Sequence, residues 1–215
     1  MCQQRPALLW HWQASQGWAW LLGATRAYDQ AEPSSLLRQS EDEAPKFQTA
    51  EITENGVTSL VITAYLGEAN EVTIPAVING LPVTAIGPRA FAGNTTLTGV
   101  NIPEGVVQIG EYAFATCGAL QTVELPKSLT AIMAGAFSGC AYLYRADIPN
   151  AVVSIGDYAF SGSGVCRITF SDNLSSLGEY AFANCENLYE VALPDSLTSI
   201  STGTFSGCTG LSRVL

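Results

Sequence analysis

The sequence predicts an α/β repeat solenoid: a right-handed coil with one parallel β-sheet, short turns or helical turns on its other side, and an N-terminal β-hairpin cap. Three observations support this fold class. A unit of 22 or 23 residues recurs along most of the chain, each unit opens with a strand-like apolar pattern, and each closes with a small residue followed by phenylalanine. No unit can bury its apolar face alone, so we expect stability to come from stacking.

The small residue and phenylalanine that close each unit mark the repeat most clearly. The pair occurs six times, at intervals of 23, 23, 23, 22 and 23 residues. Its members are Ala90-Phe91, Ala113-Phe114, Ala136-Phe137, Ala159-Phe160, Ala181-Phe182 and Thr204-Phe205. In the column of leucines that follows the pair, the 22-residue step falls one interval earlier, between Leu143 and Val165, so the single missing residue lies in a loop between Phe160 and Val165. A fixed period of about 20 to 29 residues is typical of leucine-rich repeats, whereas ankyrin and tetratricopeptide units are longer.

The first part of each unit reads L-x-x-V-x-[IL]-P, as in Leu120, Val123, Leu125 and Pro126. These apolar offsets suit a short strand with alternate side chains in a core. Proline has no N–H to donate to a strand ladder, so the strand is expected to end there.

The second part reads V-x-x-I-G-x-x-A-F, as in Val106, Ile109, Gly110, Ala113 and Phe114. Its apolar residues step by three or four, which predicts a turn or a short helical piece. The phenylalanines are expected to fill the core, together with cysteines that stand three residues later in four units. The predicted core residues are Phe91, Phe114, Phe137, Phe160, Phe182, Phe205, Cys117, Cys140, Cys185 and Cys208.

A hairpin is expected ahead of the repeats. Two strand-like runs, Phe47 to Ile52 and Val57 to Ala64, flank Asn55-Gly56. Asn-Gly is the strongest two-residue signal for a hairpin. Such a hairpin would cap the open N-terminal end of the array.

The repeat pattern resembles the BspA-like leucine-rich repeat family of bacterial surface proteins. The resemblance covers roughly Phe47 to Leu215, about four-fifths of the chain. It extends to a longer first repeat, which carries extra residues between Pro75 and Val83. The resemblance implies a cell-surface or secreted module that adheres to host or neighbouring-cell proteins, such as matrix components.

These patterns divide the chain into two regions. Residues 46–215 form the repeat domain, with the cap and long first repeat in 46–85 and about six 23-residue repeats, the last incomplete, in 86–215. Residues 1–45 hold all four tryptophans and form a leader or linker. Three interpretations stay open for them: a disordered leader or misassigned start, a degenerate secretion signal, or a helix on a membrane surface with Trp10 and Trp18 on one face.

Composition excludes several functions. The net charge is −10 and the nine basic residues are scattered, so no nucleic-acid surface is expected. No run of 18 apolar residues exists that could form a transmembrane helix. His11 is the one histidine, and no CxxC pair occurs. We therefore expect no catalytic residue, no metal site and no cofactor.

The cysteines of the repeat have two interpretations. Stacked coils would bring Cys117 near Cys140 and Cys185 near Cys208, within reach of a disulfide in an oxidising compartment. Equivalent side chains in a stack point the same way, however, which favours buried thiols that fill the core. Cys166 stands outside this column, at the start of a strand, where it could be exposed.

The outward positions of the strands suggest a binding surface. One column holds Arg145, Arg167, Glu190 and Arg213, and Tyr144 and Tyr189 stand beside it. Arginine and tyrosine are enriched at binding hot spots, so these six residues form the candidate interface to a protein ligand. The alternative is a ladder of charges that keeps the sheet soluble.

The predicted function is therefore non-catalytic protein binding through the exposed strand face, at the cell surface or outside the cell. Two alternatives remain. The chain could be the binding arm of a larger secreted enzyme whose catalytic domain lies elsewhere. It could also form a structural array, because the last repeat is incomplete at Val214-Leu215 and its uncapped edge could pair end to end with another copy.

Overall fold

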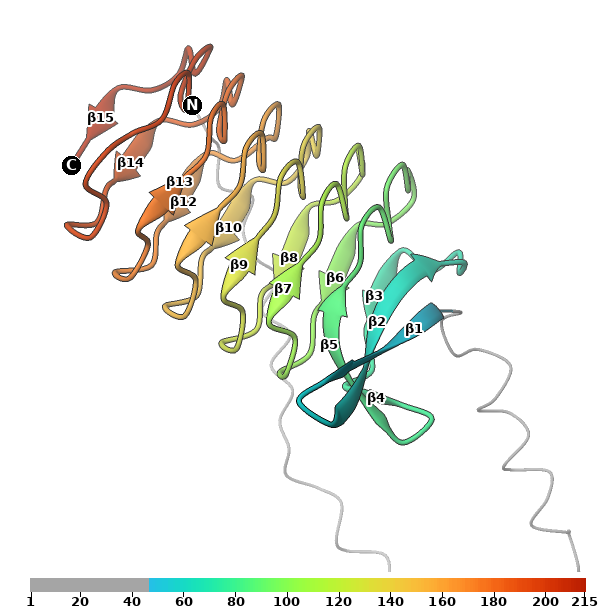
Figure 1. The fold of residues 1–215 in the computed structure, drawn as a ribbon. Helices are drawn as coiled ribbons and strands as arrows, with labels where there is room; N and C mark the ends of the chain where they lie inside the picture. The colour runs from blue at the N-terminus through green and yellow to red at the C-terminus, as the bar shows by residue number, and fades with distance from the viewer. Residues whose placement is uncertain (1–46) are drawn as a thin grey trace, which may run out of the picture. The chain divides into compact units, whose positions relative to one another are not determined.

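The computed structural model describes residues 47–215, and the three interpretations of residues 1–45 lie outside this range. The described residues form stacked coils built from 15 short strands (Figure 1). In order these are β1 (Phe47–Glu54), β2 (Val57–Tyr65), β3 (Glu71–Thr73), β4 (Val77–Ile78), β5 (Leu81–Ile86), β6 (Gly99–Asn101), β7 (Gln108–Ile109), β8 (Thr122–Glu124), β9 (Ala131–Ile132), β10 (Arg145–Asp147), β11 (Ser154–Ile155), β12 (Arg167–Thr169), β13 (Ser176–Leu177), β14 (Glu190–Ala192) and β15 (Arg213–Val214).

Most coils contribute a strand to each of two rows, where a single sheet was predicted; the coils of β14 and β15 contribute only to the first. The L-x-x-V strands form the first row, which we call the strand face; it consists of a three-stranded sheet, β3-β6-β8, and a four-stranded sheet, β10-β12-β14-β15. The V-x-x-I-G segments form a second row, β5-β7-β9-β11-β13. Pairing between coils is parallel in both rows.

The prediction of helical turns is wrong, because residues 47–215 contain no helix. The backbone N–H groups of the V-x-x-I-G segment bond to the preceding coil, as from Gly110 N to the Ile86 oxygen at 2.8 Å. A helix would need those groups to bond four residues back along the same coil. The next segment turns repeatedly, with Tyr112 and Thr116 at φ values of 54° and 57°. A left-handed residue every four positions stops a right-handed helix from forming.

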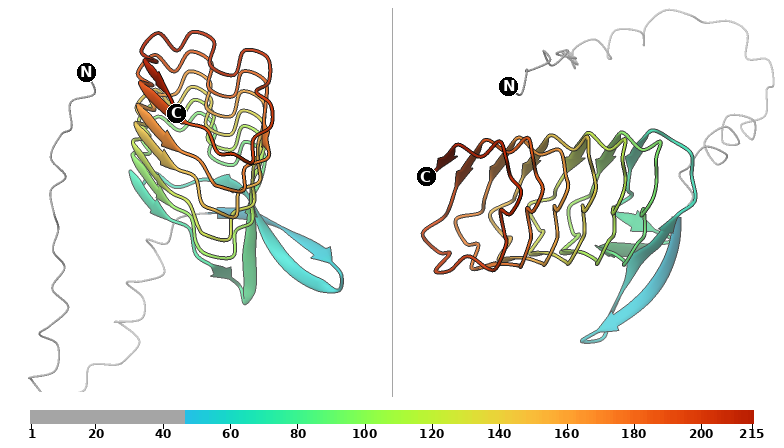
Figure 2. Two further views of the ribbon diagram at one scale, coloured as in Figure 1. Left: turned by 90° about the vertical axis from the view of Figure 1, so that its left-hand side faces the viewer. Right: turned by 90° about the horizontal axis from the view of Figure 1, so that it is seen from above.

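The hairpin is present and joins the second row. Strands β1 and β2 pair antiparallel, and the turn residues Asn55 and Gly56 both have positive φ, at 53° and 79°. Strand β2 then pairs parallel with β5, so Leu60 and Ile62 are buried against the first coil. The extra residues of the first repeat form a second hairpin, β4-β5, around Asn79-Gly80. Figure 2 shows the tip of the first hairpin extending away from the stack.

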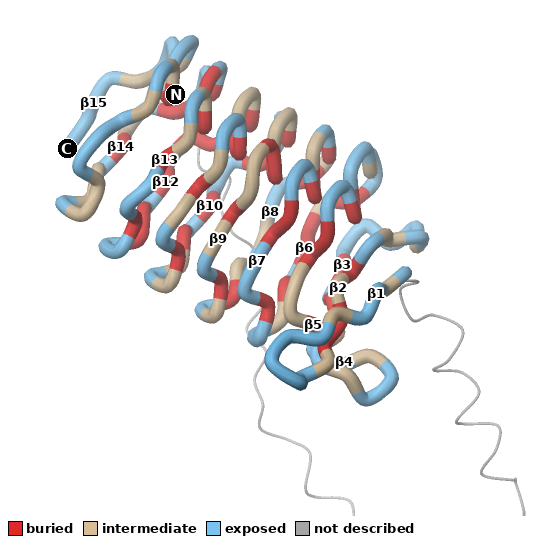
Figure 3. The backbone as a smooth tube through the Cα atoms, in the orientation of Figure 1, coloured by how far each residue is buried: buried red, intermediate tan, exposed pale blue. Residues whose placement is uncertain are grey.

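A column of stacked phenylalanine rings runs through the coils. Consecutive ring centroids from Phe91 to Phe182 lie 4.7, 5.2, 5.2 and 5.1 Å apart, with nearly parallel planes. Phe205 continues the column at 5.8 Å, and Tyr65 of the hairpin begins it at 5.3 Å from Phe91. Figure 3 shows the buried segments recurring from coil to coil. The core is therefore a continuous column of repeated side chains.

Candidate binding surface

The strand face brings the predicted charged column together. Parallel pairing places Arg145 beside Arg167, Arg167 beside Glu190, and Glu190 beside Arg213. Their neighbours in each strand, Ala146, Ile168 and Val191, are buried. Alternation along a strand therefore turns the charged residues outward, and the three arginine side chains are 64 to 69% exposed.

Two arginines share one carboxylate. Glu190 Oε2 lies 3.0 Å from a guanidinium nitrogen of Arg213, and Glu190 Oε1 lies 3.8 Å from one of Arg167. Arg145 pairs instead with Asp147 on its own strand, at 2.7 Å. The group thus carries three arginines against two carboxylates, a local positive excess on a chain whose net charge is −10.

The two predicted tyrosines, Tyr144 and Tyr189, stand one residue before strands β10 and β14. Tyr144 is 48% exposed and Tyr189 is 39% exposed. The pKa of the neighbouring Arg145 is raised chiefly by its hydrogen bond to Asp147. The backbone groups of both tyrosines form hydrogen bonds between coils, for example the 3.1 Å bond that Tyr189 N donates to the Cys166 carbonyl oxygen.

The sequence analysis did not include Tyr142, which is 68% exposed and stands two residues before Tyr144. The equivalent residues of other repeats include Thr96, Ala119 and Asn187, so an aromatic residue in this column is a departure that the sequence alone reveals.

The column cysteines are thiols without disulfides in the structure, and Cys117, Cys140 and Cys185 are buried. Each sulfur donates to the carbonyl oxygen of the phenylalanine in the preceding coil, as Cys117 does to Phe91 at 3.1 Å. Burial raises the pKa of Cys117 to about 11. Burial therefore makes the Cys117 thiol a poor nucleophile, because the thiolate is the reactive form, whereas the pKa of the partly buried Cys208 is lowered to about 7, chiefly by its hydrogen bond with Cys185. Cys166, for which the sequence left exposure to solvent open, is buried, at 8% exposed.

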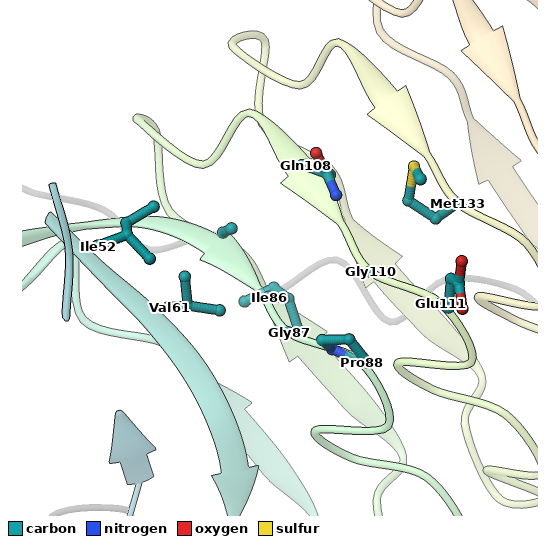
Figure 4. Close-up of a pocket in the computed structure, with 10 residues that line it drawn as sticks. Ile52, Val61, Ile86, Gly87, Pro88, Gln108, Gly110, Glu111 and Met133 are labelled. Carbon is teal, nitrogen blue, oxygen red and sulfur yellow. The ribbon is translucent and has the colours of Figure 1, made fainter. Parts of the chain in front are cut away.

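A shallow hollow of about 440 Å³ lies where the hairpin meets the second row. Figure 4 shows Ile52 and Val61 of the hairpin on one side and Gln108, Glu111 and Met133 of the coils on the other. Its single carboxylate has no acidic or basic partner in the lining. The hollow therefore lacks a paired acid and base.

Within 47–215, no group of three or more His, Cys, Asp or Glu side chains is placed to hold a metal ion. That same part of the chain has no helix long and apolar enough to cross a membrane.

Stacked coils with a repeated leucine and phenylalanine core define a leucine-rich repeat solenoid, and comparison with known proteins agrees. The profile of the BspA type leucine-rich repeat region matches six copies over residues 84–212. The chain therefore belongs to the BspA-type leucine-rich repeat family. No curated protein gave a significant match.

Solved structures show the same fold. A leucine-rich repeat protein of T. pallidum, TpLRR, is 32% identical, with a TM-score of 0.75 over 78% of each chain. A leucine-rich repeat protein of Bacteroides ovatus is 34% identical, with a TM-score of 0.71 over 78% of this chain and 45% of the other. The pneumococcal vaccine antigen PcpA shares the fold at 20% identity and a TM-score of 0.59, over 77% of this chain and 42% of its own.

Proposed function

We propose that the repeat domain is a non-catalytic protein-binding module, secreted or displayed at the cell surface, that adheres to proteins of a host or neighbouring cell. The observation that supports this most directly is the group of Arg145, Arg167 and Arg213 with Tyr144 and Tyr189 on the strand face. Proteins of this family are typically surface-associated, which supports the location.

The arginine group is better explained by binding than by stability. Exposed ion pairs contribute only about 0 to 1 kcal/mol each. Arg145 is bound to a carboxylate on its own strand, so its ion pair joins no two coils. Arginine and tyrosine, in contrast, supply most of the binding energy at many protein interfaces. The coils hold them in fixed register, which lowers the entropy lost when a partner binds.

Binding of the full chain to immobilised fibronectin and fibrinogen tests this function. The test variant replaces Arg145, Arg167 and Arg213 by glutamine. We expect its affinity for the bound protein to fall at least tenfold, because the partner loses charge-assisted contacts to three guanidinium groups.

A second triple variant separates local contacts from net charge. Gln48→Glu, Gln108→Glu and Thr209→Glu lower the net charge by the same three units at exposed positions outside the strand face, and should leave binding intact. Equal loss in both variants would contradict a specific strand-face site. A wild-type chain that binds neither protein would contradict adhesion to these matrix components.

A further inference from the structure

The first strand of the hairpin ends the larger sheet of the second row. Within residues 47–215, β1 pairs with β2 alone, so its other edge, which we call the open edge, carries no strand. β1 has eight residues, where the coil strands β6 to β15 have two or three. Natural proteins usually protect a long edge with lysine, proline or a covering segment. β1 contains neither lysine nor proline, and five of its eight residues are exposed.

The pairing within the hairpin determines which backbone groups lie on the open edge. Glu54 and Val57 flank the two-residue turn as a hydrogen-bonded pair, and such pairs alternate with pairs whose backbone groups face away from each other. The next pair, Thr53 and Thr58, is of the second kind, and its side-chain oxygens lie 3.0 Å apart. By this alternation, the β1 residues whose backbone groups face the open edge are Thr49, Glu51 and Thr53.

A hydrogen bond to the first coil supports this assignment. The carbonyl oxygen of Ile62 accepts a hydrogen bond from Gly87 N at 2.7 Å, so it faces β5 and points away from β1. Because Ile62 stands opposite Thr49, the backbone groups of Thr49 face the other way, toward the open edge. The one register shift of the hairpin lies before Thr49, so pairing is regular from there to the turn. The open edge therefore presents a regular row of N–H and carbonyl groups.

The two faces of β1 differ in chemistry. Ala50 pairs with Val61, and both Val61 and Ile52 line the hollow beside the hairpin, so one face of β1 is apolar. Side chains alternate along a strand, which places the exposed Glu51 on the opposite face. The two strands of this hairpin contain no lysine or arginine. A strand added to the open edge would thus meet apolar side chains on one face and a carboxylate on the other.

We propose that the open edge of β1 binds an extended segment of a partner protein in which apolar and basic residues alternate. Strand addition takes its affinity from main-chain hydrogen bonds and its specificity from alternate side chains. An antiparallel segment would place a basic residue opposite Glu51 and an apolar residue opposite Ile52, and both kinds of pair stabilise a sheet. The net charge of −10 also favours a cationic partner.

Charge disfavours a second copy of this chain as the occupant. Pairing between two β1 strands would bring Glu51 and Glu54 of both copies into one small sheet that contains no basic residue, and like charges across strands are destabilising. The open edge is separate from the arginines of the strand face, so it adds a second surface to the proposed function.

The probe is the peptide Lys-Val-Lys-Val-Lys-Val-amide with an N-terminal fluorescein, titrated against the full chain and followed by fluorescence anisotropy. In the proposed register, the lysine N–H groups bond to β1 and the valine N–H groups face solvent. N-methylation of the lysine amides should therefore weaken binding at least about tenfold, because hydrogen bonds are lost. N-methylation of the valine amides is the matched control and should change the affinity less than about twofold.

Two variants test the same edge from the side of the protein. Glu51→Gln and Glu51→Pro both remove the carboxylate, but proline also removes an N–H of the open edge, a position at which an edge strand tolerates proline. Glu51→Gln should weaken binding about threefold, as for one exposed ion pair, and Glu51→Pro at least about tenfold. Hydrogen exchange followed by NMR gives an independent measurement: the amide protons of Thr49, Glu51 and Thr53 should gain protection when the peptide binds.

Three results would overturn the proposal. The first is equal affinity for the two N-methylated peptides, and the second is unchanged protection of Thr49, Glu51 and Thr53 in the complex. The third is a dimer of the chain, detected by light scattering, in which these amides are protected without peptide. If Glu51→Pro does not fold, as judged by circular dichroism, the N-methylated peptides still decide, because they use the unaltered chain. Glutamine substitution of the strand-face arginines should leave peptide binding intact, so the two proposals fail separately.

Discussion

Phe137 illustrates what one side chain contributes to this core. Its ring is fully buried and lies between Phe114 and Phe160, 5.2 Å from each. Phe205, at the same position of the last coil, has one ring neighbour within residues 47–215, Phe182, and is only partly buried. The same residue type therefore has two environments in one molecule.

Phe137→Ala should lower the free energy of unfolding by about 3 to 5 kcal/mol, because it leaves a cavity between two rings that cannot close around it. Phe205→Ala should cost less than half as much, since its site is already open to water on one side. Urea unfolding of both variants measures the difference. Equal losses would show that position in the stack does not matter.

At this scale the sequence predicts which residues share an environment, because identical spacing places them in one column. It indicates the phenylalanine and cysteine columns directly. It does not reveal the conformation of the tyrosines at 112, 158 and 180, since spacing carries no information on φ or on the direction in which a ring leans. Tyr112 over Gly135 becomes visible only when the backbone is known.

Among the elements, the turn segments differ most from expectation. Apolar steps of three or four residues are shared by a helix and by a chain that turns around a corner of a coil. What separates the two is where the N–H groups bond. Here alternate groups bond to the next coil, as from Tyr112 N to the Ala134 oxygen at 2.9 Å. Single-sequence periodicity cannot supply that information.

The shortened coil gives a prediction about one such element. Gly164 stands where the chain has one residue fewer, and a Cβ there would collide with the carbonyl oxygen of Ala141 in the preceding coil. Gly164→Ala should therefore destabilise the protein by about 1 to 3 kcal/mol. Gly118→Ala, where a Cβ meets nothing within 4 Å, should change stability by less than about 1 kcal/mol. Thermal unfolding compares them; a tolerated Gly164→Ala would mean that the short coil can shift.

In the whole molecule, stability passes from neighbour to neighbour. Each coil packs against the coils before and after it, and the hairpin covers the first coil through Ile62. In such an array, a substitution that unfolds the coil at one end should destabilise the more distant coils only gradually. The hairpin was predictable from Asn55-Gly56, whereas its attachment to the second row was not, because the sequence did not predict a second row.

Ile62→Asp buries a charge at the hairpin–coil contact and should release the N-terminal coils first. Hydrogen exchange should show protection lost most around β5 and β7 and least around β12 and β14. Val57→Asp, at a hairpin residue that is 65% exposed, is the matched control and should leave the pattern unchanged. Uniform loss of protection in Ile62→Asp would instead indicate a single cooperative unit.

The hydrogen bonds between coils also have a mechanical consequence. They run along the axis of the stack, so a pull on the two ends of the described region loads the outermost coil before the others. Once that coil has unfolded, the next coil is held by the same kind of hydrogen bonds and should unfold at a similar force. Each coil of 22 or 23 residues would then add about 75 to 80 Å of extended chain. Stretched in this way, the solenoid would lengthen in nearly equal steps, as an extensible tether.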